Sequence, residues 1–357
     1  TGQKITRSEF VYDQKGNKII PRNRNLMLIE NVSDLKRAMS QYKKGFILID
    51  DVTLPKEVIE FAEKNFKKEA FDDHYTFDDN PYSLWPTGHT FNLLCPPYTE
   101  LDITDSNAVS AFFKKYTVET VVHFEAYTDV SNAEKERANM SGICWRINVE
   151  GTKHLVTAAK DAHFIYISTD MIFSGKKEDK GPYEENHLPE KNPDDEPRYG
   201  WTKKCGEDEI KNHRNYSIVR ISNPVRKNYE EKADYLQKIL SGFAQKGELT
   251  LFNDQFLTLT PFASVSDVLE KIILNKKTGI YHVSSTDVFT PYAIGSYIIQ
   301  KKYGTAGNVH PTSLEKYVAE TNQKSRYPQY GGLSVHYTEQ QLNILFPTWK
   351  QIVDTMI

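Results

Sequence analysis

The stretch HFIYIST, residues 163–169, is an apolar run rich in β-branched and aromatic side chains. Its length and composition predict a buried strand of a parallel sheet. Two similar runs, ETVVHF and YSIVRIS, lie at residues 119–124 and 216–222. Two intervening segments have helical spacing, the first with Asn148 as its expected N-cap: residues 148–162 and 199–213. Strands alternating with helices predict an α/β, Rossmann-like fold with a doubly wound parallel sheet.

After residue 223 the pattern changes to helices with short strands, which indicates a smaller α+β lobe at the carboxyl edge of the sheet. One helix ends at Gly247 and another has Pro291 in its first turn, which are common stop and start signals. Near the N-terminus, a hairpin and two βα-like units precede a long polar loop. We therefore predict three parts: an N-terminal extension (1–44), a Rossmann-like domain with a divergent first βα unit (45–225), and mainly the smaller lobe (226–357).

Composition and charge exclude several classes of protein. The chain has 357 residues and a net charge of −3, so no nucleic-acid partner is expected. No apolar run approaches the ~18 residues of a membrane span, and the polar N-terminus lacks the apolar core of a signal peptide. Three widely spaced cysteines are typical of reduced thiols, and the ten histidines lack metal-binding spacing. We expect a cytoplasmic protein with no membrane contact and no metal site.

The sequence PRYGWTKKCGE, residues 197–207, has a tyrosine and a lysine four positions apart. One helical turn places Tyr199 and Lys203 on the same face of the predicted helix. A nearby ammonium would lower the pKa of the tyrosine from its ordinary value of ~10 and make it a better proton shuttle. Such a pair alone is more simply a solvated helix start. Its position after a strand that ends in Ser-Thr-Asp favours catalysis instead.

Five further motifs occur in order along the chain: ELDITD (100–105), AYTDVSNAE (126–134), INVEGT (147–152), ISTD (167–170) and FNDQFLTLTP (252–261). Together with Tyr199 and Lys203 they resemble the motifs of the extended short-chain dehydrogenase/reductases, most closely the dTDP-4-dehydrorhamnose reductase family of sugar-nucleotide reductases. The resemblance covers residues 88–345. It implies an NAD(P)H-dependent oxidoreductase that reduces a nucleotide-activated 4-keto-6-deoxy sugar, which the smaller lobe would help to bind.

The resemblance also implies roles for individual residues. Thr169, with Ser168 beside it, would hydrogen-bond the substrate carbonyl. Tyr199 would donate the proton, and Lys203 would hold the nicotinamide ribose. Asn148 matches an asparagine of the family, for which a helix cap and a catalytic role both stay open. Further expected contacts to the cofactor, NADP or NAD, come from the LDITD segment and from the strand end before AYTD: Asp102, Ile103, Ala126 and Tyr127.

The dinucleotide-binding motif departs from the family. A Rossmann first turn needs glycines so that the backbone can approach the pyrophosphate, yet no Gly-x-x-Gly-x-x-Gly occurs anywhere in the chain. The best candidate for this turn contains Asp50 and Asp51, whose carboxylates would repel a pyrophosphate. Larger residues also replace small ones at the end of the first predicted strand and in the last motif: His123, Phe124, Glu125 and Leu257.

Two interpretations compete at this point. The chain is a divergent reductase with altered cofactor binding, or it is a non-catalytic protein on a reductase fold that acts as a regulatory or structural subunit. Retention of Thr169, Tyr199 and Lys203 together favours the enzyme. A third, weaker interpretation takes residues 1–90 as a separate interaction module. The N-terminal extension (1–44) would then contact a protein partner or a second copy of the chain.

Overall fold

The computed structural model describes residues 94–137, 139–227, 233–305, 307–321 and 328–357. The chain divides into two compact units, Thr1–Pro97 and Tyr98–Ile357. The second unit carries all the site residues predicted from the sequence. The predicted extension (1–44) and the divergent first βα unit with its Asp50–Asp51 turn lie outside the described residues.

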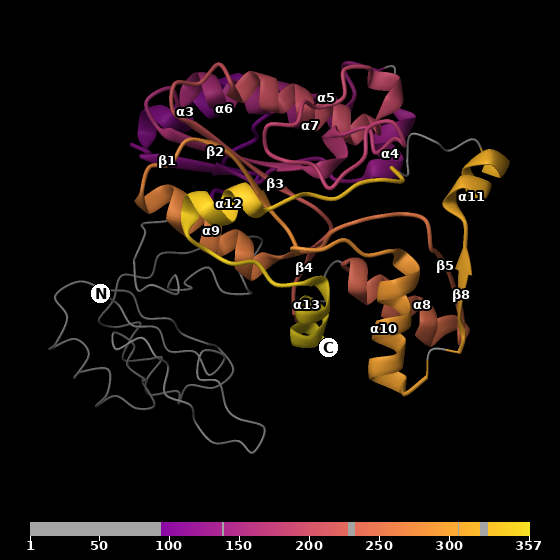
Figure 1. The fold of residues 1–357 in the computed structure, drawn as a ribbon. Helices are drawn as coiled ribbons and strands as arrows, with labels where there is room; N and C mark the ends of the chain where they lie inside the picture. The colour runs from indigo at the N-terminus through magenta and orange to yellow at the C-terminus, as the bar shows by residue number, and fades with distance from the viewer. Residues whose placement is uncertain (1–93, 138, 228–232, 306, 322–327) are drawn as a thin grey trace, which may run out of the picture. The chain divides into compact units, whose positions relative to one another are not determined.

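A four-stranded parallel sheet forms the centre of the second unit (Figure 1). Its strands are β1 (Thr120–His123), β2 (His163–Thr169), β3 (Tyr216–Ile221) and β7 (Gly279–Val283), in the order β1-β2-β3-β7. All seven residues of β2 are buried, because the strand lies between two neighbours and is covered on both faces. The continuous apolar run that marks it in the sequence follows from this position.

Helices cover both faces of the sheet. Figure 1 shows one group packed above the strands: α3 (Ser106–Lys115), α5 (Ile143–Trp145), α6 (Thr152–Ala158) and α7 (Arg198–Ile210). The opposite face holds α9 (Phe262–Leu274) and α12 (His336–Leu342), which both contact β7. This arrangement confirms the predicted Rossmann-like α/β fold with its parallel sheet.

The helix that leads into α6 begins earlier than predicted. It runs from α5 through a π-helical segment, Arg146–Gly151, and continues without a break into α6. Asn148 therefore lies inside the helix, and its prediction as an N-cap is wrong. A side chain with favourable capping chemistry is no proof of a helix start when the preceding residues, such as Ile143 and Trp145, also adopt helical geometry.

The smaller lobe is built on two short parallel strand pairs and several helices. β4 (Pro224–Val225) pairs with β6 (Thr260–Pro261), and β5 (Leu249–Phe252) pairs with β8 (Val309–Thr312). The helices are α8 (Tyr235–Lys246), α10 (Pro291–Tyr303), α11 (Leu314–Thr321) and α13 (Trp349–Met356). An apolar core that includes Leu236, Ile298 and Trp349 holds α8, α10 and α13 together. Gly247 and Gly304 end α8 and α10 in the left-handed region, as predicted from the sequence.

The chain crosses back to the main sheet within the segment that we assigned mainly to the lobe. β7 pairs with β3, and α9 and α12 pack on this part of the sheet. The segment 226–357, which we assigned mainly to the lobe, therefore also contributes these three elements to the main sheet and its helices. The sequence GIYHV has the same apolar pattern whether its strand lies in the lobe or in the sheet, so the pattern alone does not locate it.

Candidate active site

Thr169 is the last residue of β2, where the strand meets the carboxyl edge of the sheet. Its hydroxyl caps a short 3₁₀ turn, Asp170–Ile172, by accepting a hydrogen bond of 3.2 Å from the Met171 N–H. The same hydroxyl donates to Asp170 Oδ1 at 3.2 Å. The neighbouring Ser168 is buried, and its Oγ has no hydrogen-bond partner among the described residues.

Helix α7 brings Tyr199 to this edge of the sheet. Its Gly200 lies so close to the turn after β2 that a Cβ atom would come within 1.9 Å of the Met171 carbonyl oxygen. Only a glycine permits this approach without displacement of the helix. The contact places the first turn of α7, with the partly exposed Tyr199, beside the turn that follows Thr169.

The Tyr199 hydroxyl lies in surroundings that keep it protonated. Burial raises its pKa well above the ordinary value, and the negative potential of Asp170 and Cys144 raises it further. Our expectation that Lys203 lowers the pKa of Tyr199 is therefore wrong for this structure. Loss of water around a phenol penalises the phenolate, and this penalty exceeds any stabilisation by the lysine.

Lys203 itself is only 2% exposed. Its Nζ lies 3.9 Å from the centroid of the Tyr166 ring, a cation–π contact within the site. Burial lowers the pKa of Lys203 to about 7, while Glu207, Cys144 and Glu125 act in the opposite direction. Near neutral pH this side chain is therefore divided between its charged and neutral forms.

Asp170 links the site to the lobe. Its Oδ2 accepts a hydrogen bond of 2.6 Å from Ser222 Oγ, which also donates to the carbonyl of Thr258. Burial raises the pKa of Asp170, and the hydrogen bonds from Ser222 and Thr169 partly offset this effect. The signal for Asp170 in the sequence is its position directly after the strand that ends in Ser-Thr.

Asn148 joins three elements of the site. Its Oδ1 accepts from the Tyr127 N–H at 2.7 Å, and its Nδ2 donates to Thr202 Oγ1 on α7 at 2.9 Å. It thereby holds the predicted cofactor-binding segment, Ala126 and Tyr127, against α7. The π-helical turn that carries Asn148 is a departure from regular geometry often found at functional sites.

The two residues of the LDITD segment that we predicted to contact the cofactor differ in their environment. Asp102 is partly exposed and accepts hydrogen bonds from Thr104 and from the Tyr98 hydroxyl, which lower its pKa although burial opposes them. Ile103 is 7% exposed, and its side chain packs so tightly on Gly151 that a Cβ there would come within 2.7 Å. The Ile103 side chain thus belongs to the core, and its backbone carbonyl lies 2.9 Å from His154 Nδ1.

Comparison with known proteins relates this site to a family. A family model described as the RmlD substrate binding domain matches residues 83–357. The chain belongs to this family. The resemblance to the extended reductases inferred from Thr169, Tyr199 and the other motifs is thereby confirmed.

Two relatives of this RmlD family chain cover most of its described part. A probable low-salt glycan biosynthesis reductase of Haloferax volcanii is 28% identical over 259 residues, which are 71% of this chain and 81% of the relative. The spore coat polysaccharide biosynthesis protein SpsK of Bacillus subtilis is 26% identical over 254 residues, 70% of this chain and 83% of SpsK.

Solved structures of dTDP-4-dehydrorhamnose reductases have the same fold. The enzyme from Bacillus anthracis in complex with NADP superimposes with a TM-score of 0.62 and 26% identity, covering 72% of this chain and 87% of that chain. The ortholog from Clostridium acetobutylicum has a TM-score of 0.62 and 25% identity over the same shares.

Two departures of this chain from the RmlD family motifs are explained by packing. His123 is 3% exposed, and its Nε2 lies 3.0 Å from Thr152 Oγ1. Burial and the nearby Lys203 lower the pKa of His123 to about 3, so it is a neutral core side chain. Leu257 lies in the apolar core of the lobe, and its backbone pairs with Phe289. Neither residue enters the site as an unpaired polar group.

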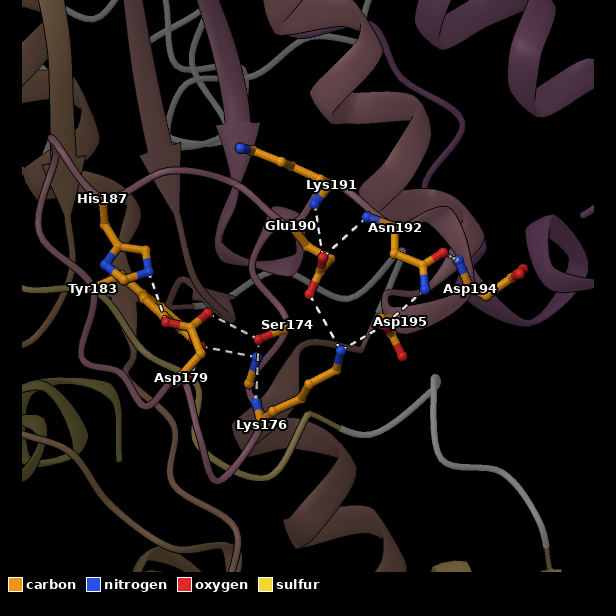
Figure 2. A network of polar contacts seen from close by, with 11 residues as sticks. Ser174, Lys176, Asp179, Tyr183, His187, Glu190, Lys191, Asn192, Asp194 and Asp195 are labelled. Atoms are coloured by element: carbon orange, nitrogen blue, oxygen red, sulfur yellow. Dashed lines mark hydrogen bonds and ion pairs between the residues drawn. The ribbon is translucent and has the colours of Figure 1, made fainter.

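The long loop between Thr169 and Tyr199 is tied down by a polar network (Figure 2). Lys176 Nζ lies 2.6 Å from Asp195 Oδ2 and 3.4 Å from Glu190 Oε2. In the other half of the network, Asp179 accepts from Ser174 at 2.9 Å and lies 2.8 Å from His187 Nε2. The loop therefore has a defined structure beside α7.

Neither a metal site nor a membrane span is found in the part of the chain that the structure describes. No group of three or more His, Cys, Asp or Glu side chains could hold a metal ion there. No helix among those residues is long and apolar enough to cross a bilayer. The predicted cytoplasmic location stays a prediction.

Proposed function

We propose that the chain is an NADPH- or NADH-dependent reductase of a nucleotide-activated 4-keto-6-deoxy sugar. The observation that supports the proposal is the close packing of α7, which carries Tyr199 and the buried Lys203, against β2 and the turn that follows Thr169. Family membership supports it, as do relatives named as reductases of glycan and sugar-nucleotide metabolism.

The side chains fit the demands of a carbonyl reduction. The high pKa of Tyr199 keeps its proton on the oxygen at neutral pH, so it can donate this proton to the alkoxide that forms from a carbonyl. Thr169 Oγ1 now donates to Asp170 over 3.2 Å, and it could turn this hydrogen bond toward the same carbonyl oxygen. Two hydroxyl donors at one oxygen orient the substrate and stabilise its developing charge.

The donor groups also fit the nicotinamide end of a dinucleotide. The Lys203 ammonium offers N–H donors to ribose hydroxyls. Ser168 Oγ, which has no hydrogen-bond partner among the described residues, could form a further hydrogen bond to the cofactor. When bound, the reduced nicotinamide supplies the hydride. Asn148 holds Ala126 and Tyr127 in place for this end of the cofactor.

We further propose that Asp102 and the backbone of Ile103 contact the adenine. The carboxylate of Asp102 is partly exposed and accepts hydrogen bonds, as recognition of an exocyclic amine requires. The pyrophosphate cradle is the weakest part of the proposal, because the chain lacks the glycine pattern. Each lost hydrogen bond to a charged group weakens binding by about 1.5–3 kcal/mol, so we expect weak cofactor affinity.

The lobe assigned to residues 226–357 would hold the sugar nucleotide, apart from β7, α9 and α12. Asp170 and Ser222 join this lobe to the catalytic edge and so align bound substrate with Tyr199. The alternative proposal, a non-catalytic subunit on the same fold, is favoured by the missing glycines alone. A protein partner or a homo-oligomer would suit that alternative, and the N-terminal extension is the segment we propose for such a contact.

Calorimetric titration with NADPH and NADH, followed by turnover of a dTDP-activated 4-keto-6-deoxy sugar, tests the proposal. We expect weak binding by the native protein, a loss of binding in Lys203→Ala, and a loss of turnover with retained binding in Tyr199→Phe. Absence of binding of either nucleotide at millimolar concentration would overturn the reductase proposal in favour of the non-catalytic alternative.

A further inference from the structure

A fully buried ion pair lies one helical turn beyond Lys203 on α7. Glu207 and Arg220 are 0% and 1% exposed. Arg220 donates from Nε to Glu207 Oε1 at 2.9 Å and from its second guanidinium nitrogen to Oε2 at 2.8 Å, a bidentate arrangement. Burial of two charges is costly unless both are paired and hydrogen-bonded, so a pair at this position requires an explanation beyond stability.

The position of Glu207 supplies that explanation. It follows Lys203 by four residues, as Lys203 follows Tyr199, so one face of α7 presents the three side chains in successive turns. The remaining guanidinium nitrogen of Arg220 lies 3.3 Å from His282 Nε2 on β7 and donates to the Glu185 carbonyl at 3.4 Å. The pair thus fixes the face of α7 to β3, β7 and the loop before α7.

We propose that the Glu207–Arg220 pair is a positioning device that holds Lys203 over β2 and favours its ammonium form. The inference rests on the proposed role of Lys203 as the ligand of the nicotinamide ribose. Glu207 and Arg220 touch no substrate in this scheme. They act through Lys203.

The electrostatics around Lys203 support this assignment. Burial lowers the pKa of Lys203, and among the groups that raise it Glu207 has the largest effect, ahead of Cys144 and Glu125. The other elements packed against Lys203 present the Tyr166 ring from β2 and the neutral His123 from β1. Without the Glu207 charge the lysine would lose its proton at a lower pH and would be largely neutral under physiological conditions.

The test is a pH titration of Lys203 in the full chain, followed by ¹³C NMR of labelled lysine side chains and assigned with Lys203→Met. Glu207→Gln alone leaves Arg220 buried without its partner and is expected to destabilise the fold. The main variant is therefore the double substitution Glu207→Gln with Arg220→Gln, which removes both charges. Glu185→Gln is the matched control, since Glu185 is a buried acid of the same network that contacts Thr338.

We expect the pKa of Lys203 to fall in the double variant, to stay unchanged in Glu185→Gln, and to be retained in Glu207→Asp. The pH above which NADPH affinity is lost should fall by the same amount. The inference is overturned if the double variant folds and its Lys203 pKa is unchanged. It is also overturned if Glu207→Asp lowers the Lys203 pKa as much as the double variant does. If native protein binds no nucleotide while the Lys203 pKa moves as expected, the proposed function fails and the charge-holding role of Glu207 remains.

Discussion

Helices α7 and α8 have nearly equal lengths, 13 and 12 residues, but bury opposite kinds of side chain. The buried positions of α8 are apolar: Leu236, Ile239 and Phe243. Those of α7 are mostly polar, charged or glycine: Arg198, Gly200, Thr202, Lys203, Gly206, Glu207 and Ile210. The face of α8 stabilises the lobe by removing apolar area from water, whereas most of the face of α7 does not.

The difference shows that the molecule buries ionisable groups, at a cost in stability, beside the proposed active site. Burial of Lys203 lowers its pKa to about 7, and burial of Glu196, just before α7, raises the pKa of that carboxyl to about 9. Both shifts mean that the folded state holds an ionisable group in an unfavourable environment. Such strain is expected at functional positions and is not expected in a helix whose only task is packing.

The largest effect should come from Lys203→Met. The native lysine is penalised most below pH 7, where the folded protein must bury its charge, and the penalty disappears by pH ~10.5, where the unfolded chain loses the proton too. We therefore expect the free energy of unfolding to rise by about 3–5 kcal/mol at pH 7, with the gain shrinking as pH increases. Nucleotide affinity should fall at the same time. Chemical denaturation at several pH values measures the first effect and calorimetry the second.

A control for this prediction lies on the same helix. Lys204→Met changes a side chain whose ammonium stacks on the Trp201 ring near the surface. Its effect on unfolding should be small, because this side chain is partly exposed and its ion pair with Asp208 lies near the surface. A similar gain from both substitutions would mean that the burial of Lys203 carries no special penalty and would remove the contrast between α7 and α8.

Glu196→Gln should produce the opposite pH dependence. Glu196 is fully buried, and neither carboxylate oxygen has a hydrogen-bond partner among the described residues. Because the folded pKa is raised to about 9, the native protein loses stability as pH rises from about 4.5 to 9, while the uncharged glutamine does not. We expect a gain of about 2–3 kcal/mol at pH 7 that vanishes near pH 4.5. Glu184→Gln, at an exposed position of the same loop, is the control.

Glycines distinguish the two helices as well. A Cβ at Gly200 on α7 would meet backbone, the Met171 carbonyl, whereas one at Gly242 on α8 would lie 3.3 Å from the movable end of Leu249. Gly200→Ala should therefore destabilise by about 1–3 kcal/mol and reduce turnover, because α7 must move away from Thr169. Gly242→Ala should be neutral or stabilise by up to about 1 kcal/mol through helix propensity. Thermal unfolding of both variants checks the pair, and equal losses would refute the close approach of α7.

The contrast also explains what the sequence could reveal. Strand β2 and the end of helix α8 were predicted to the residue, because a buried apolar run and a helix stop at Gly247 have strong local patterns. Tyr199, Lys203 and Thr169 were proposed from the order of the motifs, and their catalytic roles stay a prediction. Two features depend on contacts between distant segments, which no local pattern encodes. They are the hydrogen bond between Asn148 and the Tyr127 N–H, and the pairing of β7 with β3.

The electrostatics of the site were the least predictable part. One helical turn between Tyr199 and Lys203 predicted correctly that they share a face, yet it gave the wrong direction for the pKa of Tyr199. The spacing of residues predicts which groups are neighbours, whereas burial determines whether each group is charged or neutral. Glu196 likewise reads as one more acid in a polar loop, although the fold encloses it completely.

The smallest effect should come from the N-terminus of α8, where the helix is held by a local device. Asp234 accepts a hydrogen bond of 2.9 Å from the Gln237 N–H, and Gln237 Oε1 accepts from the Asp234 N–H at 3.0 Å. Loss of such a cap costs about 1 kcal/mol, so Asp234→Ala should lower the midpoint of urea unfolding slightly. Its effect should not depend on pH between 6 and 9, because no buried charge is involved, and nucleotide affinity should be unchanged.

Helix α7 begins after Pro197 with no side-chain cap from that residue, so its start depends on tertiary contacts such as that of Gly200. A loss from Asp234→Ala as large as that from Gly200→Ala would show that α8 too depends on its first turn more than on its apolar face, and the distinction between the two helices would fail.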